Sequence, residues 1–194
     1  MNKNPELILL FSGKRKSGKD FITDLLLEKF DKELAVIIKI SGPIKSYWAQ
    51  TNNVALDELL SSGETKEQYR KDMIIWSEQL RNQDPGVFCR QAIEMYRAVQ
   101  WPVWIVSDVR RKTDVEWFQN NYSGKVKTIR IEASEDSRKK RGWSFVSGVD
   151  DVASECDLDD YCGWDWIIHN DGDKSIDDPL TSIIACIQSV TQVP

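Results

Sequence analysis

The stretch that most limits how this chain can fold is residues 6–30, where an apolar run leads through a glycine-bearing turn into a helical pattern. Within FSGKRKSGKD, at residues 11–20, Gly13, Gly18 and Lys19 match the spacing G-x-x-x-x-G-K. A strand that passes through such a turn into a helix directs backbone N–H groups and the positive end of the helix dipole at one point. The segment therefore predicts a phosphate-binding loop on an α/β fold.

Apolar runs and helical patterns alternate along the rest of the chain. The strands we expect lie at residues 6–13, 35–41, 103–108, 126–133 and 165–170, and helices at 19–30, 114–122 and 178–190. This alternation predicts one α/β domain over residues 1–194, with a five-stranded parallel sheet in a three-layer α/β/α arrangement.

Three further segments interrupt this alternation. Residues 43–97 are mostly helical in pattern and would form an acceptor region. Residues 134–152 begin helical and end as a polar loop, which suits a lid, and residues 153–163 are expected to be an acidic loop. No linker divides the chain, so all three would belong to the same domain.

Charge is spread unevenly over the 194 residues, whose formal net charge is −5. Residues 150–178 hold eleven acids and one lysine, whereas nine of the ten arginines fall between Arg70 and Arg141. Such clustering predicts an anionic ligand. A sequence pI near 5.1 disfavours nucleic acid as that ligand.

Other residue types exclude several kinds of protein. No window approaches eighteen consecutive apolar residues, so no membrane span is expected. The four cysteines lack a metal-binding spacing, and His169 is the single histidine, which disfavours a His-rich metal site or a Ser-His-Asp relay. We expect an intracellular, cytosolic protein, with a peroxisomal location left open.

The glycine-rich loop carries unusual chemistry. Lys19 is placed to reach the β- and γ-phosphates of a nucleotide, and Lys14, Arg15 and Lys16 add charge that would stabilise the phosphoryl oxygens in a transition state. Asp20 stands where Ser or Thr usually ligates Mg²⁺. Its carboxylate is predicted either to bind Mg²⁺ or to pair with Lys19 or Lys16.

A second polar group follows the strand at residues 103–108. Asp108 ends that strand, and Arg110 and Arg111 come directly after it. The carboxyl ends of parallel strands face the ligand crevice, so these side chains predict a Mg²⁺ ligand and a phosphate clamp. The alternative is that Asp108 caps the next helix. Arg130 lies inside an apolar strand and needs a partner.

No obvious general base lies near the loop. A hydroxyl acceptor would need one, whereas a phosphate acceptor has a second pKa of about 6 and is already ionised at neutral pH. Bringing a phosphate to a triphosphate requires many cations and little acid–base chemistry. The arginine-rich middle of the chain therefore favours a phosphate acceptor without naming it.

Seven stretches, taken together, resemble the animal-type phosphomevalonate kinase family from about residue 6 to residue 172. They are FSGKRKSGKDF, SGPIK, YRKDMIIWSE, DPGVFCR, WIVSDVRR, SRKKRGW and GVDDVASEC. The resemblance implies a nucleoside-monophosphate-kinase-like P-loop fold. It also implies Mg²⁺-dependent transfer of the ATP γ-phosphate to 5-phosphomevalonate, giving 5-diphosphomevalonate and ADP in the mevalonate route to isoprenoids and sterols.

The resemblance assigns roles to residues of this chain. ATP would be bound by Gly13, Lys14, Arg15, Lys16, Ser17, Gly18, Lys19 and Asp20, with Arg138 and Arg141 of the lid. Phosphomevalonate would be bound by Lys45, Arg81, Arg90, Arg110, Arg111 and Asn170. The residues we expect to be catalytic are Lys19, Arg15, Asp20, Arg110 and Arg111, and the expected metal ligands are Asp20 and Asp108.

Two other functions remain open from the sequence. One is a different small-molecule or nucleoside monophosphate kinase of the same fold, and the other is a nucleotide-binding module without catalysis. The guanine-binding N-K-x-D and switch D-x-x-G patterns of GTPases are not evident. We expect ATP, ADP and phosphomevalonate as partners, no nucleic acid or membrane, and a monomer. The segment after Gly172 receives no role.

Overall fold

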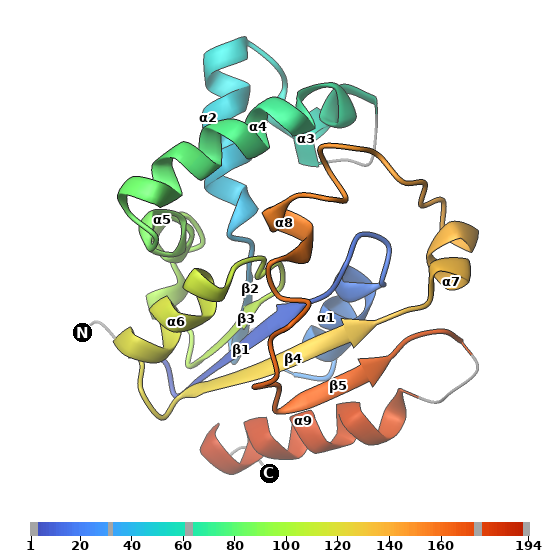
Figure 1. Ribbon diagram of the computed structural model, residues 1–194. Coiled ribbons are helices and arrows are strands. Elements are labelled where there is room, and N and C mark those ends of the chain that lie inside the picture. Colours follow the sequence, from blue (N-terminus) through green and yellow to red (C-terminus); the bar gives the residue numbers. More distant parts are fainter. Residues whose placement is uncertain (1–3, 31–32, 61–63, 173–175, 192–194) are drawn as a thin grey trace.

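A five-stranded parallel sheet forms the centre of the molecule in the computed structural model, which describes residues 4–30, 33–60, 64–172 and 176–191 (Figure 1). The strands run in the order β2-β3-β1-β4-β5. Their bounds are β1 Leu7–Ser12, β2 Ala35–Ile38, β3 Val103–Val106, β4 Val126–Glu132 and β5 Trp166–His169. The predicted sheet is confirmed, with β1 at its centre, so the loop that follows β1 lies mid-sheet at the carboxyl edge.

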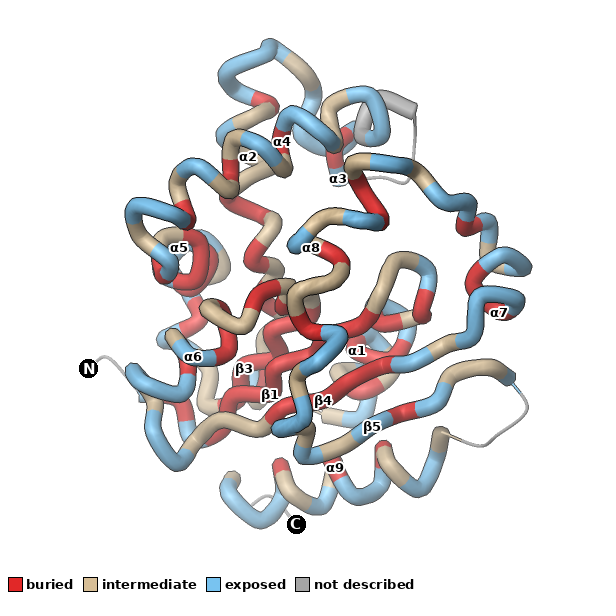
Figure 2. Tube along the Cα trace, in the orientation of Figure 1, coloured by how far each residue is buried: buried red, intermediate tan, exposed pale blue. Residues whose placement is uncertain are grey.

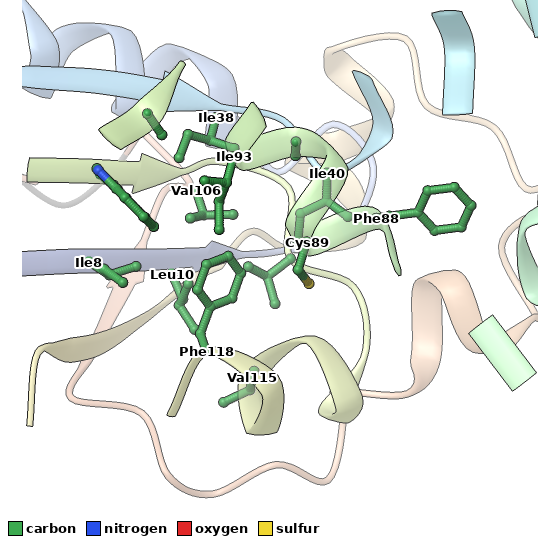
Figure 3. Close-up of a cluster of buried hydrophobic side chains, with 14 of the residues drawn as sticks. Ile8, Leu10, Ile38, Ile40, Phe88, Cys89, Ile93, Val106, Val115 and Phe118 are labelled. Carbon is green, nitrogen blue, oxygen red and sulfur yellow. The ribbon is translucent and has the colours of Figure 1, made fainter. Parts of the chain in front are cut away.

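Helices cover both faces of the sheet, because successive strand side chains point to opposite sides. Leu7, Leu9 and Phe11 pack toward α1 (Lys19–Leu27) and α9 (Asp177–Thr191). Ile8 and Leu10 face α5 (Val87–Met95) and α6 (Lys112–Asn121), as Figure 3 shows. Every residue of β1 and β3 is buried (Figure 2), which fixes the strand that leads into the glycine-rich loop and its neighbour, which leads to Asp108, Arg110 and Arg111.

The predicted acceptor region is helical; its last helix, α5, covers a face of the sheet, whereas the helices before it lie away from the sheet (Figure 1). It consists of α2 (Ser41–Asn52), α3 (Leu56–Leu60), α4 (Glu64–Gln83) and α5, followed by a short 3₁₀ helix at Ala98–Gln100. Within the described ranges, none of the helices combines the length and apolar character needed to cross a membrane.

The predicted lid begins with α7 (Glu135–Lys140) and continues as a loop. The expectation of a loop over residues 153–163 was wrong at its start, where α8 spans Ala153–Cys156. This helix forms because buried Glu155 and Leu158 anchor the segment to the body of the protein, which an acidic composition alone does not reveal.

Candidate active site

The loop between β1 and α1 bends sharply at two positions. Lys16 has φ of 62° and Gly18 has φ of 90°, both in the left-handed region. A Cβ at Gly18 would lie 2.2 Å from Asn170 Nδ2, and that amide donates a 2.9 Å hydrogen bond to the Ser17 carbonyl. Gly18 is therefore required both for its backbone conformation and for the close approach of Asn170.

Gly18→Ala is expected to destabilise the protein and weaken ATP binding, because it adds the collision with Asn170 to the strain of positive φ. Gly172→Ala is a matched control, since Gly172 has φ of 89° but no neighbour within 4 Å of its added Cβ among the described residues. Both variants lose about 1–2 kcal/mol to backbone strain. Urea unfolding should show a larger loss for Gly18→Ala; equal losses would contradict the packing argument.

Lys19 and Asp20 begin α1 and face the cavity beside the loop. Lys19 is 7% exposed, and its burial, with the nearby Arg110, lowers its pKa to about 8. Burial raises the pKa of Asp20, but Lys19 and Lys39 outweigh it and keep the pKa below the usual value. Asp20 Oδ1 lies 3.2 Å from Lys39 Nζ. The site therefore offers an ionised carboxylate next to a lysine that loses its proton more readily than an ordinary lysine.

The lowered pKa of Lys19 predicts proton uptake when ATP binds above about pH 8. Bound phosphate raises the lysine pKa again, so affinity should fall as pH rises through the pKa of the free site. Calorimetry in two buffers of different ionisation enthalpy should register nearly one proton taken up per site at about pH 9. Lys19→Met should lack this uptake, and uptake that persists in Lys19→Met would assign it to another group.

A cavity of about 240 Å³ opens between the loop, α2, α4 and the segment after β3. Eight of its lining side chains are cationic and three are acidic. Six of these cations were predicted for the site: Arg15, Lys19, Lys45, Arg81, Arg110 and Arg111. Lys39 was missed, although its place just after β2 put it at the carboxyl edge. The cavity has the size and charge to hold small phosphorylated anions.

Arg110 and Arg111 enter this cavity from the segment between β3 and α6. Arg110 Nη1 donates to the Gly13 carbonyl at 3.4 Å and pairs with Glu155. Arg111 is 6% exposed and pairs with Glu78 through Nη2. Its Nε and Nη1 are buried and find no hydrogen-bond partner in the described part of the chain. A buried guanidinium with free donors is costly unless an anion completes it.

The acidic segment around α8 neutralises the loop, a role that sequence reasoning missed. Glu155 accepts hydrogen bonds from the Arg15 backbone N–H and from Arg110. Asp150 pairs with the Arg15 side chain at 2.8 Å. Asp159 pairs with Lys14 at 2.7 Å and is also the partner of Arg130, at 2.9 Å. An acidic run and a cationic run in one chain were a signal for this pairing.

Asp108 occupies the carboxyl edge of β3 as predicted, and it lines the cavity. Its two oxygens accept backbone N–H groups of Ile40, at 2.5 Å, and Ser41, at 3.0 Å, at the start of α2. It therefore caps a helix, although α2 rather than the next helix along the chain. Each carboxylate oxygen has two acceptor sites, so this role leaves capacity for a metal-bound water.

Mg²⁺ fits this donor set without a dedicated cage. Among the described residues, no group of three His, Cys, Asp or Glu side chains is arranged to hold a metal. Mg²⁺ in phosphotransfer sites is commonly held by one or two carboxylates plus substrate phosphates and water. Asp20, with its exposed, ionised carboxylate in the cavity, satisfies that requirement, and Asp108 lines the same space.

Comparisons with known proteins agree with this geometry. Residues 11–124 match the family model described as phosphomevalonate kinase. A phosphomevalonate kinase of Drosophila melanogaster is 48% identical over 167 residues, covering 84% of this chain and 88% of that protein. The chain belongs to the phosphomevalonate kinase family.

Two solved structures share the fold. TT1252 from Thermus thermophilus gives a TM-score of 0.51 at 16% identity and covers 94% of this chain and 98% of its own. A gluconokinase from Sinorhizobium meliloti gives a TM-score of 0.51 at 11% identity, and the match covers 98% of this chain and 95% of the gluconokinase. These likenesses support the P-loop kinase fold and carry no information about the substrate.

Two residues assigned to substrate by resemblance to the phosphomevalonate kinase family do not line the cavity. Arg90 lies on α5, where its half-exposed side chain pairs with Asp84. Asn170 lies beyond β5 and donates to the Ser17 carbonyl. Lys45 and Arg81 do line the cavity, and burial lowers the pKa of Lys45.

The lid arginines lie over the glycine-rich loop. Arg138 Nε donates to the Arg15 carbonyl at 2.8 Å, and its guanidinium lies 4.1 Å from the Trp143 ring centre. Arg141 Nη1 donates to the Ser17 carbonyl at 3.1 Å. In this conformation both arginines of the predicted lid bind carbonyl groups of the glycine-rich loop.

Proposed function

We propose that this protein transfers the γ-phosphate of ATP to the phosphate of 5-phosphomevalonate, giving 5-diphosphomevalonate and ADP. Family membership supports the reaction. The observation that carries the acceptor side is Arg111, because its side chain lines a cationic cavity and its buried Nε and Nη1 lack a partner among the described residues. A phosphate dianion would supply the acceptor that this incompletely bonded guanidinium lacks.

The arrangement suits an acceptor that needs no general base. The second pKa of a phosphate monoester is about 6, so the attacking oxygen is ionised at neutral pH. The remaining obstacle is repulsion between two anions. Arg110, Arg111 and Lys19 line the same cavity, so their charges would reduce this repulsion and stabilise the transferred phosphoryl group.

On the nucleotide side, we propose that the backbone N–H groups of the loop and Lys19 hold the ATP phosphates. Asp20, with Asp108 through water, would hold Mg²⁺, which supplies charge neutralisation between the β- and γ-phosphates. Arg138 and Arg141 would turn from loop carbonyl groups toward ATP.

On the acceptor side, Lys45 and Arg81 are proposed to bind phosphomevalonate together with the arginine pair. The substrate has a carboxylate as well as a phosphate, so it needs cationic groups at two separate points. Lys45 comes from α2, whereas Arg81 comes from α4 beside Arg111. Lys45 is therefore the better candidate for the carboxylate.

A coupled ADP-release assay with a panel of acceptors tests the proposed function. Phosphomevalonate should give one ADP for each 5-diphosphomevalonate found by mass spectrometry, while AMP, CMP and gluconate should give none. Turnover with one of those three and none with phosphomevalonate would overturn the proposal. Tight ATP binding with no phosphorylated product would instead indicate a nucleotide-binding module.

A further inference from the structure

The carboxylate of Asp114 was not among the predicted site residues, yet it contacts three arginines that were. Asp114 lies in the first turn of α6 and is 0% exposed. Its Oδ2 accepts the backbone N–H groups of Arg110, at 3.2 Å, and Arg111, at 3.1 Å. Its Oδ1 accepts a hydrogen bond from Arg81 Nη1. All three arginines line the cavity, so a single buried group connects three of the cations proposed to bind the acceptor.

The surroundings of Asp114 allow few alternatives to these contacts. Arg81 is 8% exposed, and its guanidinium lies 5.3 Å from the Phe88 ring centre. The Cys89 thiol lies 3.8 Å from Oδ1, where burial and the carboxylate raise its pKa, so it stays protonated and can donate. A buried charge without its partner is strongly unfavourable, and Asp114 and Arg81 therefore hold each other in place.

We propose that Asp114 is a positioning residue that sets the geometry of the acceptor phosphate clamp, an inference that rests on the proposed function. The two backbone hydrogen bonds fix the peptide groups from which the Arg110 and Arg111 side chains leave. The ion pair fixes the guanidinium of Arg81. Because a displacement of about 1 Å can cost roughly a hundredfold in rate, a residue that touches no substrate can control turnover.

Asp114→Asn tests this role because it is nearly isosteric. Its amide has one acceptor oxygen, so its NH₂ group must face either Arg81 or the two backbone N–H groups, all of which are donors. We expect kcat to fall and KM for phosphomevalonate to rise, each by roughly tenfold or more. The Kd for ADP should stay unchanged, because the glycine-rich loop does not contact Asp114 within the described ranges.

Asp157→Asn is the matched control. Asp157 accepts the backbone N–H of Lys112 at 2.7 Å, and Lys112 lies in the same first turn of α6 as Asp114. In the described parts of the chain, Asp157 bonds to no arginine. A loss of helix capping alone would affect both variants alike. We expect near-wild-type kinetics for Asp157→Asn, and a similar change in kcat and KM for both variants would reduce Asp114 to a helix cap.

A second pair of variants keeps the proposal testable if Asp114→Asn does not fold. Both variants carry Arg81→Leu, which removes the positive charge that pairs with Asp114. The first adds Asp114→Asn, which retains an acceptor for the backbone N–H groups of Arg110 and Arg111. The second adds Asp114→Ala, which retains none. The Ala variant should have a kcat about tenfold below that of the Asn variant. Equal rates would overturn the proposal. If wild type itself fails to turn over phosphomevalonate, it is the proposed function that is wrong.

Discussion

Arg111→Met is expected to lower kcat with ATP and phosphomevalonate by roughly 100- to 1,000-fold, the usual cost of removing one charge-stabilising donor from a transition state. The reason is that Arg111 is buried in the cavity and has two donors, Nε and Nη1, without a partner in the described ranges. Methionine keeps much of the volume but none of the donors. Steady-state kinetics of ADP release measure the effect.

Arg97→Met provides the control for Arg111→Met. Arg97 is an exposed arginine that does not line the cavity, so its loss tests the effect of removing one positive charge from the protein. We expect Arg97→Met to retain wild-type kcat. Thermal unfolding of both variants must show that Arg111→Met is folded. A folded Arg111→Met with wild-type kcat would remove Arg111 from the site.

Lys19→Met is expected to lower kcat by roughly 100- to 1,000-fold while it changes KM for phosphomevalonate much less. Lys19 lies at the start of α1 beside the glycine-rich loop and lines the cavity, where we propose that it binds the phosphate that is transferred. Its charge is therefore needed mainly while that phosphate moves. Single-turnover measurements with saturating ATP separate the chemical step from nucleotide binding.

Lys29→Met is a suitable control, because Lys29 is exposed and lies just beyond the other end of α1. It should behave as wild type in both binding and turnover. If Lys19→Met reduces phosphomevalonate binding as strongly as it reduces the rate, Lys19 is a general anion-binding group. Its proposed role in the transition state would then be wrong.

Much of the fold follows from local patterns in the sequence. The run LILLFS, followed by Gly13, is typical of a buried strand that enters a turn. The burial of both faces of this strand and the helix after the turn could be predicted from the sequence. Asp108, Arg110 and Arg111 could be placed at the carboxyl edge because they directly follow a strand. Such predictions depend on neighbours a few residues away, which a sequence displays.

Contacts between distant segments could not be predicted in the same way. Arg81 and Arg90 both belong to the helical acceptor region, yet Arg81 lines the cavity and Arg90 pairs with Asp84 away from it. The packing of α4 against α2, α3 and α5 separates the two arginines. Asp114 and Glu155 were missed for the same reason, because the arginines with which they pair are distant in the sequence and are brought close only by the fold.

The class of acceptor and the identity of the acceptor are indicated by different features of the sequence. The charge pattern and the absence of an obvious general base indicated a phosphate acceptor but not which one. The motif set supplied phosphomevalonate. The structure adds a reason for the reaction to work in this chain, because the cavity gathers eight cationic side chains against three acidic ones.

The most direct test is a crystal structure of the enzyme with ADP, Mg²⁺, a planar phosphoryl mimic and phosphomevalonate. We predict that the acceptor phosphate lies within hydrogen-bonding distance of the Arg111 guanidinium, with Lys19 and Arg110 on the transferred group. An acceptor phosphate bound elsewhere, with Arg111 still paired only to Glu78, would contradict the proposal that this cationic cavity brings the two anions together.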